Sequence, residues 1–348
     1  MKGKDLRNAA RVLVIKRDGL RQFVEAEPAF SAIRHAHPGA TIDLLTNPML
    51  HRLARSAPFF DRVVATRPLA LKGDKRELAS QLKRVGYAVV YDLDGTRESM
   101  DLRGAIRGLR GPQWIGPKRP LSEGRRALAP TPLAGPGMRK LLHAAGLTLD
   151  ERLPDLGWSA RAADGTANME PAWFGLPQSY GLFIPATADQ HRWPAERFGE
   201  LAAALGAEGI TPVIIGPEEM APFAAEVIRA AGEVGNPSGR MPVDLCGKAD
   251  AAQLAVIGRG ARFFVAGPAE ELHLVASLGI GGVVVIPPSE DISGDALFGR
   301  NIVKLTASRL HRVEGELALN TLRNMGLLGQ PEPRAGTGRA LKSRRVLR

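Results

Sequence analysis

Cysteine and long apolar runs are what this sequence most lacks. Its 348 residues include one cysteine, Cys246, and seven histidines. A single cysteine excludes a disulfide framework and a cysteine-based zinc site, and it is typical of a reducing, cytoplasmic setting. No apolar stretch approaches the roughly 20 residues of a membrane span. The N-terminal MKGKDLRNAA has no signal-peptide core. We therefore expect a cytoplasmic protein with no transmembrane segment.

Several motifs of common enzyme classes are also missing. The sequence contains no P-loop, no HExxH and no GxSxG. The segment GIGG at 279–282 is not followed by a helical pattern, so it is not a dinucleotide-binding fingerprint. Cys246 lies within an apolar run and is expected to be a small core residue. The chemistry must therefore come from other residues.

Charge is abundant and unevenly placed, with a net charge of +11. The tail at 331–348 holds six basic residues and one acidic residue, and we expect it to be a disordered basic arm. A second basic cluster comprises Arg103, Arg107, Arg110, Lys118, Arg119, Arg125 and Arg126. Such fields attract anionic lipid head groups, phosphorylated sugars or nucleic acid. Peripheral contact with a membrane surface is one expectation, whereas nucleic acid, which rests on charge alone, is not the expected partner.

Short β-rich runs alternate with amphipathic stretches, which predicts an α/β fold with parallel sheets. A chain of this length suits two domains. We place a doubly wound, Rossmann-like domain at 1–160 and a second at 175–328, separated by Pro/Gly-rich and polar segments, with a closing helix near 309–328. Ligands of such sheets bind beyond the carboxyl ends of the strands, so we expect a site in an interdomain cleft. The predicted strands are 11–16, 41–46, 62–66, 87–93, 180–186, 210–216, 243–247, 261–267 and 281–287.

The run VVYDLDG at 89–95 is close to the first motif of the haloacid-dehalogenase-like phosphatases, in which the first aspartate is a nucleophile. That reading makes Asp92 catalytic. The phosphatase chemistry also needs a Ser or Thr, a Lys and an acidic pair at later strand ends to hold Mg²⁺. The later strands end in IPA, IIG, LCG, VAG and VIP, without a carboxylate. A phosphatase is therefore only a remote alternative, and Asp92 is expected simply to end a strand.

Six segments between about 10 and 325 form a recognisable series: VLVIKRDGLRQFVEAEPAFSAIRHAHPGATIDLLTNP, APFFDRVV, the Asp-Leu-x-Gly phrase at Asp92, IPATADQHRWPAERFGELA, IIGPEE and DLCGKADAAQLA. In their order these segments resemble family 9 glycosyltransferases, the ADP-heptose:lipopolysaccharide heptosyltransferases of the GT-B fold. The resemblance implies sugar transfer from an ADP-heptose-like nucleotide-sugar donor to a lipopolysaccharide-core or related anionic, lipid-linked acceptor. It also implies inversion, with no metal and no cofactor. Action at the inner face of the membrane would follow.

The resemblance assigns residues to both sides of the expected cleft. The loop from Thr187 to Arg192 precedes Trp-Pro and a helical pattern, so a helix N-terminus and basic side chains would favour an anion there. The residues expected to bind the nucleotide-sugar are Thr187, His191, Arg192, Glu219, Lys248 and His273. The residues expected to bind the acceptor are Asp92, Asp94, Arg97 and Arg119.

Two motifs depart from the resembled family. Its Ser-Leu-Gly-Asp loop, which ends in the proposed catalytic base, reads Gly-Leu-Arg-Gln here and ends in Gln22. An amide cannot accept the proton of the acceptor hydroxyl at neutral pH, so Asp18 and Glu25 are the candidate replacements. Its Asp-Thr-Gly-Pro-Met-His reads Pro-Ala-Glu-Glu-Leu-His and brings Glu270 and Glu271 toward the donor diphosphate. A catalytically degenerate GT-B scaffold that binds a sugar, nucleotide or protein without turnover is therefore the main alternative.

Overall fold

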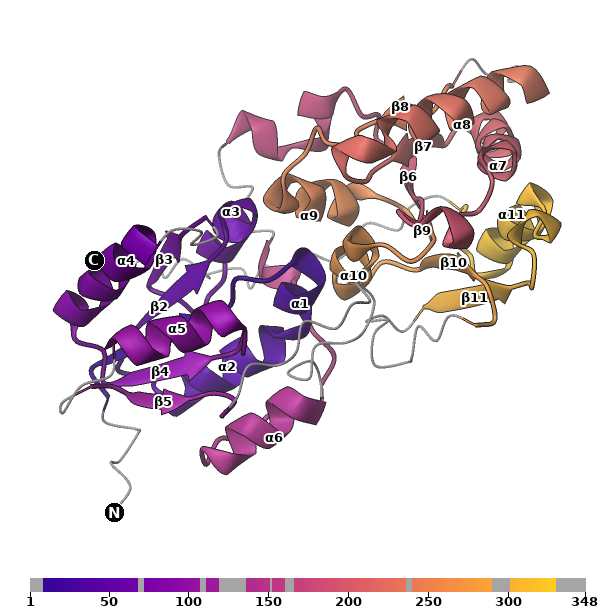
Figure 1. Ribbon diagram of the computed structural model, residues 1–348. Coiled ribbons are helices and arrows are strands. Elements are labelled where there is room, and N and C mark those ends of the chain that lie inside the picture. Colours follow the sequence, from indigo (N-terminus) through magenta and orange to yellow (C-terminus); the bar gives the residue numbers. More distant parts are fainter. Residues whose placement is uncertain are drawn as a thin grey trace, which may run out of the picture.

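The chain forms two α/β units, each built on an all-parallel sheet (Figure 1). The computed structural model describes residues 9–67, 72–106, 111–118, 136–150, 152–159, 166–235, 240–289 and 301–329. The basic tail at 331–348 and most of the second basic cluster, including Arg119, lie outside these residues. The fold class predicted from the sequence is confirmed.

The N-terminal sheet has the strand order β3-β2-β1-β4-β5. Strand β1 is almost continuously buried, because helices cover both faces of the sheet. Its pairing with β4 sets Ile15 opposite Asp92, so the two strands end at the same edge. The strands are β1 (Arg11–Ile15), β2 (Thr41–Thr46), β3 (Arg62–Ala65), β4 (Val89–Asp92) and β5 (Gln113–Ile115). The helices of this half are α1 (Leu20–Glu25), α2 (Glu27–Ala36), α3 (His51–Arg55), α4 (Lys72–Val85), α5 (Arg97–Ile106) and α6 (Pro136–Ala144).

The C-terminal sheet has the order β11-β10-β9-β6-β7-β8. Strands β6 and β9 are neighbours, and Gly267 at the end of β9 donates to Ile184 O at the end of β6 over 2.8 Å. The strands are β6 (Tyr180–Ile184), β7 (Thr211–Ile214), β8 (Val243–Asp244), β9 (Phe264–Ala266), β10 (Gly282–Ile286) and β11 (Ile302–Thr306). The helices are α7 (Ala195–Ala207), α8 (Ala221–Val234), α9 (Ala251–Gly260), α10 (Glu270–Ser277) and α11 (Gly315–Asn324).

The predicted strands match observed strands, and two strands were missed. β5 is a three-residue strand within a Pro/Gly-rich segment of the first predicted domain. β11 is an edge strand whose residues are half-buried or exposed. The closing helix is shorter than predicted: a 3₁₀ turn at Leu310–Arg312 precedes α11. These errors concern short or edge elements, where the apolar signal is weakest.

Pro28 divides the first helical stretch in two. Helix α1 ends at Glu25, and α2 begins at Glu27 with the proline in its first turn, where a missing N–H costs nothing. Ala26 keeps a helical conformation between them, so the two helices abut. Gln22 and Glu25 consequently both lie on α1, one turn apart.

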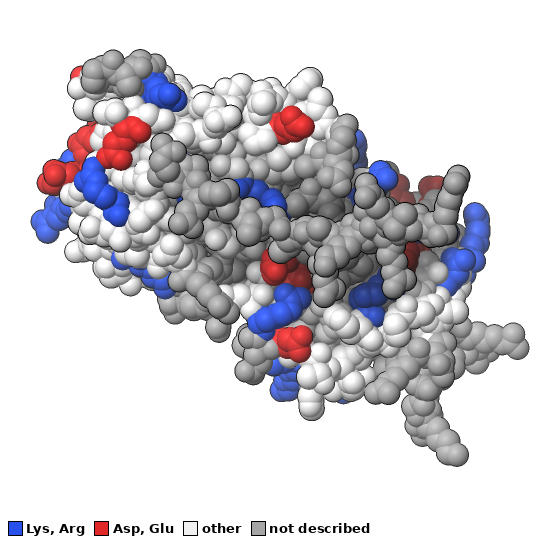
Figure 2. All heavy atoms as spheres, turned by 180° about the vertical axis from the view of Figure 1, so that it is seen from behind, with Lys and Arg blue, Asp and Glu red and all other residues white. Residues whose placement is uncertain are grey.

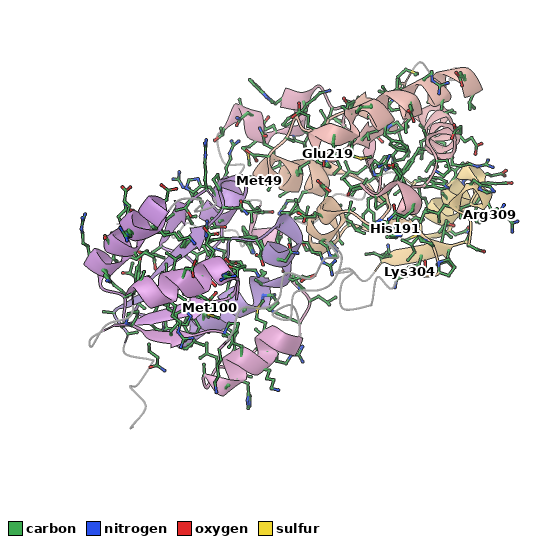
Figure 3. The ribbon with its side chains drawn as sticks, viewed as in Figure 1. Met49, Met100, His191, Glu219, Lys304 and Arg309 are labelled. Atoms are coloured by element: carbon green, nitrogen blue, oxygen red, sulfur yellow. The ribbon has the colours of Figure 1, made fainter. Side chains whose placement is uncertain are left out.

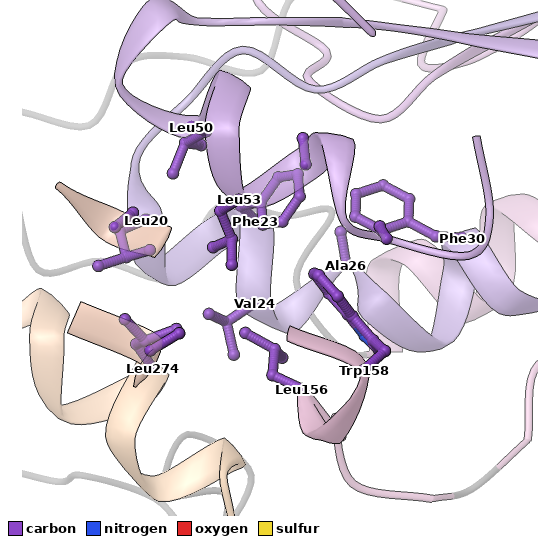
Figure 4. Close-up of a cluster of buried hydrophobic side chains, with 14 of the residues drawn as sticks. Leu20, Phe23, Val24, Ala26, Phe30, Leu50, Leu53, Leu156, Trp158 and Leu274 are labelled. Atoms are coloured by element: carbon purple, nitrogen blue, oxygen red, sulfur yellow. The ribbon is translucent and has the colours of Figure 1, made fainter. Parts of the chain in front are cut away.

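A hydrophobic core crosses the junction between the two domains (Figure 4). Leu20 and Val24 of α1 meet Leu274 of α10, and all three are buried. Leu156 and Trp158, from the segment that leads into the second domain, complete this cluster, both at 9% exposure or less. The two sheets are therefore joined by apolar packing as well as by the chain.

Ion pairs reinforce this junction. Arg152 makes a bidentate pair with Glu27, with both N–O distances 2.8 Å, and Glu27 is only 2% exposed. Arg52 of α3 donates to Asp250 over 3.2 Å and to Asn168 over 2.6 Å. Guanidinium groups therefore tie the N-terminal domain to the connecting segment and to the start of α9.

The surface offers no strong single-sign patch on the face seen in Figure 2, where basic and acidic side chains of the described residues are interspersed. Within the described ranges, no helix combines the length and the apolar character needed to cross a bilayer.

Candidate functional site

The carboxyl ends of the two sheets meet where α1 begins after β1 and α10 begins after β9. Glu270, the first residue of α10, accepts a hydrogen bond from the backbone N–H of Leu20 over 3.2 Å. Its side chain remains exposed. Because β1 and β9 are central strands, this contact joins the two sheet edges at which ligands of α/β folds bind.

Gly19 lies between two side chains at this contact. A Cβ atom on Gly19 would come within 2.8 Å of Glu270 Oε1 and 2.9 Å of Gln22 Oε1. A side chain at this position would push the ends of both flexible side chains aside. Gln22 Oε1 is buried and has no hydrogen-bond partner among the described residues. The two positions that depart from the resembled family motifs thus lie against the same glycine.

A buried charged cluster lies behind this contact, at the ends of β1 and β4. Lys16 is 1% exposed, and its ammonium group donates to Asp18 over 2.9 Å and to Leu93 O over 3.0 Å. Asp94 accepts from the backbone N–H of Arg17 over 2.6 Å. Burial, together with the nearby negative charge of Asp18, raises the pKa of Asp94 to about 7. Asp94 is thus a carboxyl group that changes charge near neutral pH.

Asp92 is fully buried and is used locally. Its Oδ1 accepts from the backbone N–H groups of Asp94 and Gly95 over 3.2 and 2.9 Å, and its Oδ2 accepts from Ser99 over 2.8 Å. Burial raises its pKa in spite of these bonds. This is the geometry of an Asx turn that ends a strand and leads into a helix, and it does not expose a nucleophile.

The other predicted residues of the N-terminal domain lie in different surroundings. Glu25 is paired with Arg21 over 2.7 Å and its side chain is 7% exposed. Arg97 is exposed at the start of α5. Of the predicted acceptor residues, Asp92 and Asp94 lie together at the end of β4, Arg97 begins the helix that follows, and Arg119 lies outside the described residues.

In the C-terminal domain, the loop after β6 is held by its own arginine. Arg192 donates to the carbonyl oxygens of Ala186 and Thr187, pairs with Asp189 over 2.8 Å and lies 4.9 Å from the ring centroid of Phe223. Thr187 is exposed. Helix α7 follows, with Pro194 at its N-cap and no side-chain cap. The guanidinium thus orders the loop and leaves positive charge next to the N-terminus of α7.

The remaining donor-side residues follow neighbouring strands. Figure 3 shows His191, after β6, and Glu219, after β7, at different places in this domain. Lys248 pairs with Asp244 over 2.7 Å. His273 is 5% exposed within α10. Burial raises the pKa of Glu271, and the nearby negative charges of Glu270 and Glu219 raise it further. Together with Lys248 and the histidines, these carboxylates place both acidic and basic groups at this sheet edge.

Two facing parallel-sheet domains with a site at their junction define a GT-B-type architecture. The family model for glycosyltransferase family 9 (heptosyltransferase) matches residues 76–283, more than half of the chain. The chain belongs to glycosyltransferase family 9. A search of curated proteins found no match.

Solved structures share this fold at low sequence identity. A family 9 glycosyl transferase from Veillonella parvula has 17% identity and a TM-score of 0.71, with 93% of this chain and 99% of that one covered. The ADP-heptose LPS heptosyltransferase II of E. coli has 17% identity and a TM-score of 0.68, with 91% and 98% covered. The E. coli heptosyltransferase WaaC with ADP has 16% identity and a TM-score of 0.65, with 90% and 99% covered.

Sequence reasoning missed two participants in the site. Lys16 ends the predicted strand 11–16, and its burial has no signal in the sequence, because lysine is rarely fully buried and is so only when it is paired. Glu270 was noted as an obstacle to a diphosphate, and its contact with Leu20 was not foreseen. That contact joins residues 250 positions apart in the chain, and no local pattern reports it.

Proposed function

We propose that this protein transfers a sugar from an ADP-heptose-like nucleotide-sugar to a hydroxyl group of a lipopolysaccharide-core or related anionic, lipid-linked glycan. The observation that carries the proposal is the meeting of the β1 and β9 carboxyl ends at Leu20 and Glu270. Donor and acceptor held at the two sheet edges would meet there. Membership of family 9 supplies the reaction class.

The donor is proposed to lie along the C-terminal sheet edge. Thr187, His191 and Arg192 would approach the diphosphate beside the N-terminus of α7, where free N–H groups favour an anion. Lys248 would add a cation, and Glu219 and His273 are kept as proposed contacts to the nucleoside and sugar. No metal or other cofactor is included in this proposal.

The acceptor is proposed to lie along the N-terminal sheet edge. Arg97 is exposed there at the start of α5, and Arg119 is proposed to act with it on the charge of the acceptor. Asp92 and Asp94 are proposed to shape this edge, the first through its turn and the second through its bond to Arg17. A lipid-linked acceptor would bring the protein to the cytoplasmic surface of a membrane.

Calorimetry with ADP, UDP and GDP tests the donor half of the proposal. We expect ADP to bind most tightly, and Arg192→Ala to weaken this binding because the loop after β6 loses its internal tie. Arg192→Lys should weaken binding less. Arg229→Ala is the matched control, since Arg229 is an exposed, ion-paired arginine of α8 in the same domain. Equal ADP affinities for wild type, Arg192→Ala and Arg229→Ala would refute this site.

A scaffold without turnover is the second candidate function. Three carboxylates, those of Glu219, Glu270 and Glu271, stand on the donor side, and Gln22 cannot act as a base. The test is an assay of sugar transfer with an ADP-sugar donor and a lipopolysaccharide-core acceptor. Tight nucleotide binding with no product would support the scaffold.

A further inference from the structure

The position at which family resemblance places the catalytic base is occupied by an amide, and a carboxylate from the other domain lies next to it. Glu270 Oε1 and Gln22 Oε1 both approach the same side of Gly19. Glu270 reaches this place from α10, across the domain junction. A carboxylate is therefore present close to residue 22, although it is supplied by a different part of the chain.

The two nearest carboxylates in sequence are less available than Glu270. Asp18 is paired with the buried ammonium of Lys16, and its second oxygen is buried without a partner among the described residues. Glu25 is paired with Arg21, and its side chain is 7% exposed. Glu270 is exposed, and it is the one of the three that contacts both domains.

We propose that Glu270 is the general base of the transfer reaction. The inference rests on the proposed function. The carboxylate of Glu270 takes the proton of the acceptor hydroxyl as that oxygen forms a bond to the anomeric carbon of the donor. The bond from the anomeric carbon to the diphosphate oxygen breaks, and the leaving nucleoside diphosphate keeps the electron pair. No metal or redox partner is needed to balance this step.

Gln22 then has the role of a positioning residue. Its amide can turn to present Nε2 as a donor toward the Glu270 carboxylate, and the Leu20 N–H already donates to Oε2. An aspartate at position 22 would instead set two carboxylates around Gly19, and their negative charges would repel each other. The departures at 22 and 270 are thus compatible with each other, whereas either one alone would disturb the site.

The experiment compares four proteins in the transfer assay: wild type, Glu270→Gln, Gln22→Asp and the double variant. Glu270→Gln keeps an acceptor oxygen for Leu20 N–H, and we expect kcat to fall by roughly 10² to 10⁴ with donor affinity changed little. Glu316→Gln is the matched control, since Glu316 is an exposed first-turn glutamate of α11 in the same domain.

The double variant provides the decisive comparison. In the double variant, position 22 carries a carboxylate and position 270 does not. Its kcat should be at least tenfold higher than that of Glu270→Gln. A thermal melt followed by circular dichroism establishes that each variant is folded. Unchanged kcat in Glu270→Gln overturns the assignment.

The wild type separates the two proposals. Transfer by wild type at a rate that Glu270→Gln does not change overturns Glu270 as the base and leaves the proposed function standing. Donor binding without any transfer refutes the proposed transfer, and the base assignment with it, and supports the scaffold. Absence of donor binding in calorimetry refutes the proposed function itself, and the base assignment with it.

Discussion

Asp94 makes the stability of the N-terminal domain depend on pH in a direction opposite to that of most carboxylates. Burial beside Asp18 raises the pKa of Asp94 from 3.8 to about 7. Between these two values the folded state holds a proton that the unfolded state has released, so stability falls as pH rises. This loss of stability is absent below about pH 4 and complete above about pH 7. A difference of about three pH units corresponds to about 4 kcal/mol.

The perturbation is Asp94→Asn, which keeps an oxygen for the N–H of Arg17 and cannot ionise. Urea unfolding followed by tryptophan fluorescence at intervals from pH 4.5 to 8 gives the free energy of unfolding of both proteins. We expect the variant to gain on wild type between pH 4.5 and about pH 7, by about 3 kcal/mol, and the difference to level off above that. A difference between the two proteins that does not change with pH would refute the reasoning.

Asp61→Asn is the control of opposite sign. Partial burial acts to raise the pKa of Asp61, but the Ile42 N–H and the Arg34 guanidinium lower it overall. Ionised Asp61 therefore stabilises the fold above its ordinary pKa of 3.8, and this stabilisation is lost as pH falls through the lowered value. The variant should lose stability at neutral pH and approach wild type in acid.

Substitutions at three further residues test other parts of the structure. Leu274→Ala leaves a cavity in the core at the domain junction and should cost roughly 2–5 kcal/mol in denaturant unfolding, whereas no loss would mean that the domains are not packed together there. Arg152→Ala leaves the buried carboxylate of Glu27 without its partner and should cost roughly 3 kcal/mol, with Arg152→Lys recovering part of it in a thermal melt. Asp92→Asn should change no phosphatase activity, because the wild type should release no phosphate in a magnesium-dependent assay. Release that the variant abolishes would restore the phosphatase interpretation.

The architecture could be predicted because its signals are local. Strands such as β1 and β10 are continuous apolar runs, which are typical of sheets covered on both faces. β11 escaped prediction because an edge strand has one half-exposed face, and β5 because three residues carry too little pattern. Strand order depends on contacts between distant residues and was not predicted, whereas two doubly wound domains with a cleft between them were expected from the pattern and from the family resemblance.

The site was predictable only in part, for the same reason. The loop after β6 could be found from Pro194 and the helical pattern that follows it. The hydrogen bonds that Arg192 makes within the loop could not be predicted, because their acceptors are backbone carbonyl groups, which every residue has. Lys16, Asp18 and Asp94 come together through parallel pairing of β1 with β4, and the pKa of Asp94 is raised by burial at this place and by the nearby charge of Asp18.

The apolar core at the domain junction determines what happens when the chain is cut into two pieces. Leu20 and Val24 belong to one half, Leu274 belongs to the other, and a cut between 159 and 166 would expose all three to water. Neither fragment would be expected to remain soluble by itself, since each would carry an uncovered apolar surface. Expressed together, the two pieces have matching surfaces and should find each other. A division of the chain in this interval therefore requires that both pieces be produced together, so that each covers the apolar surface of the other.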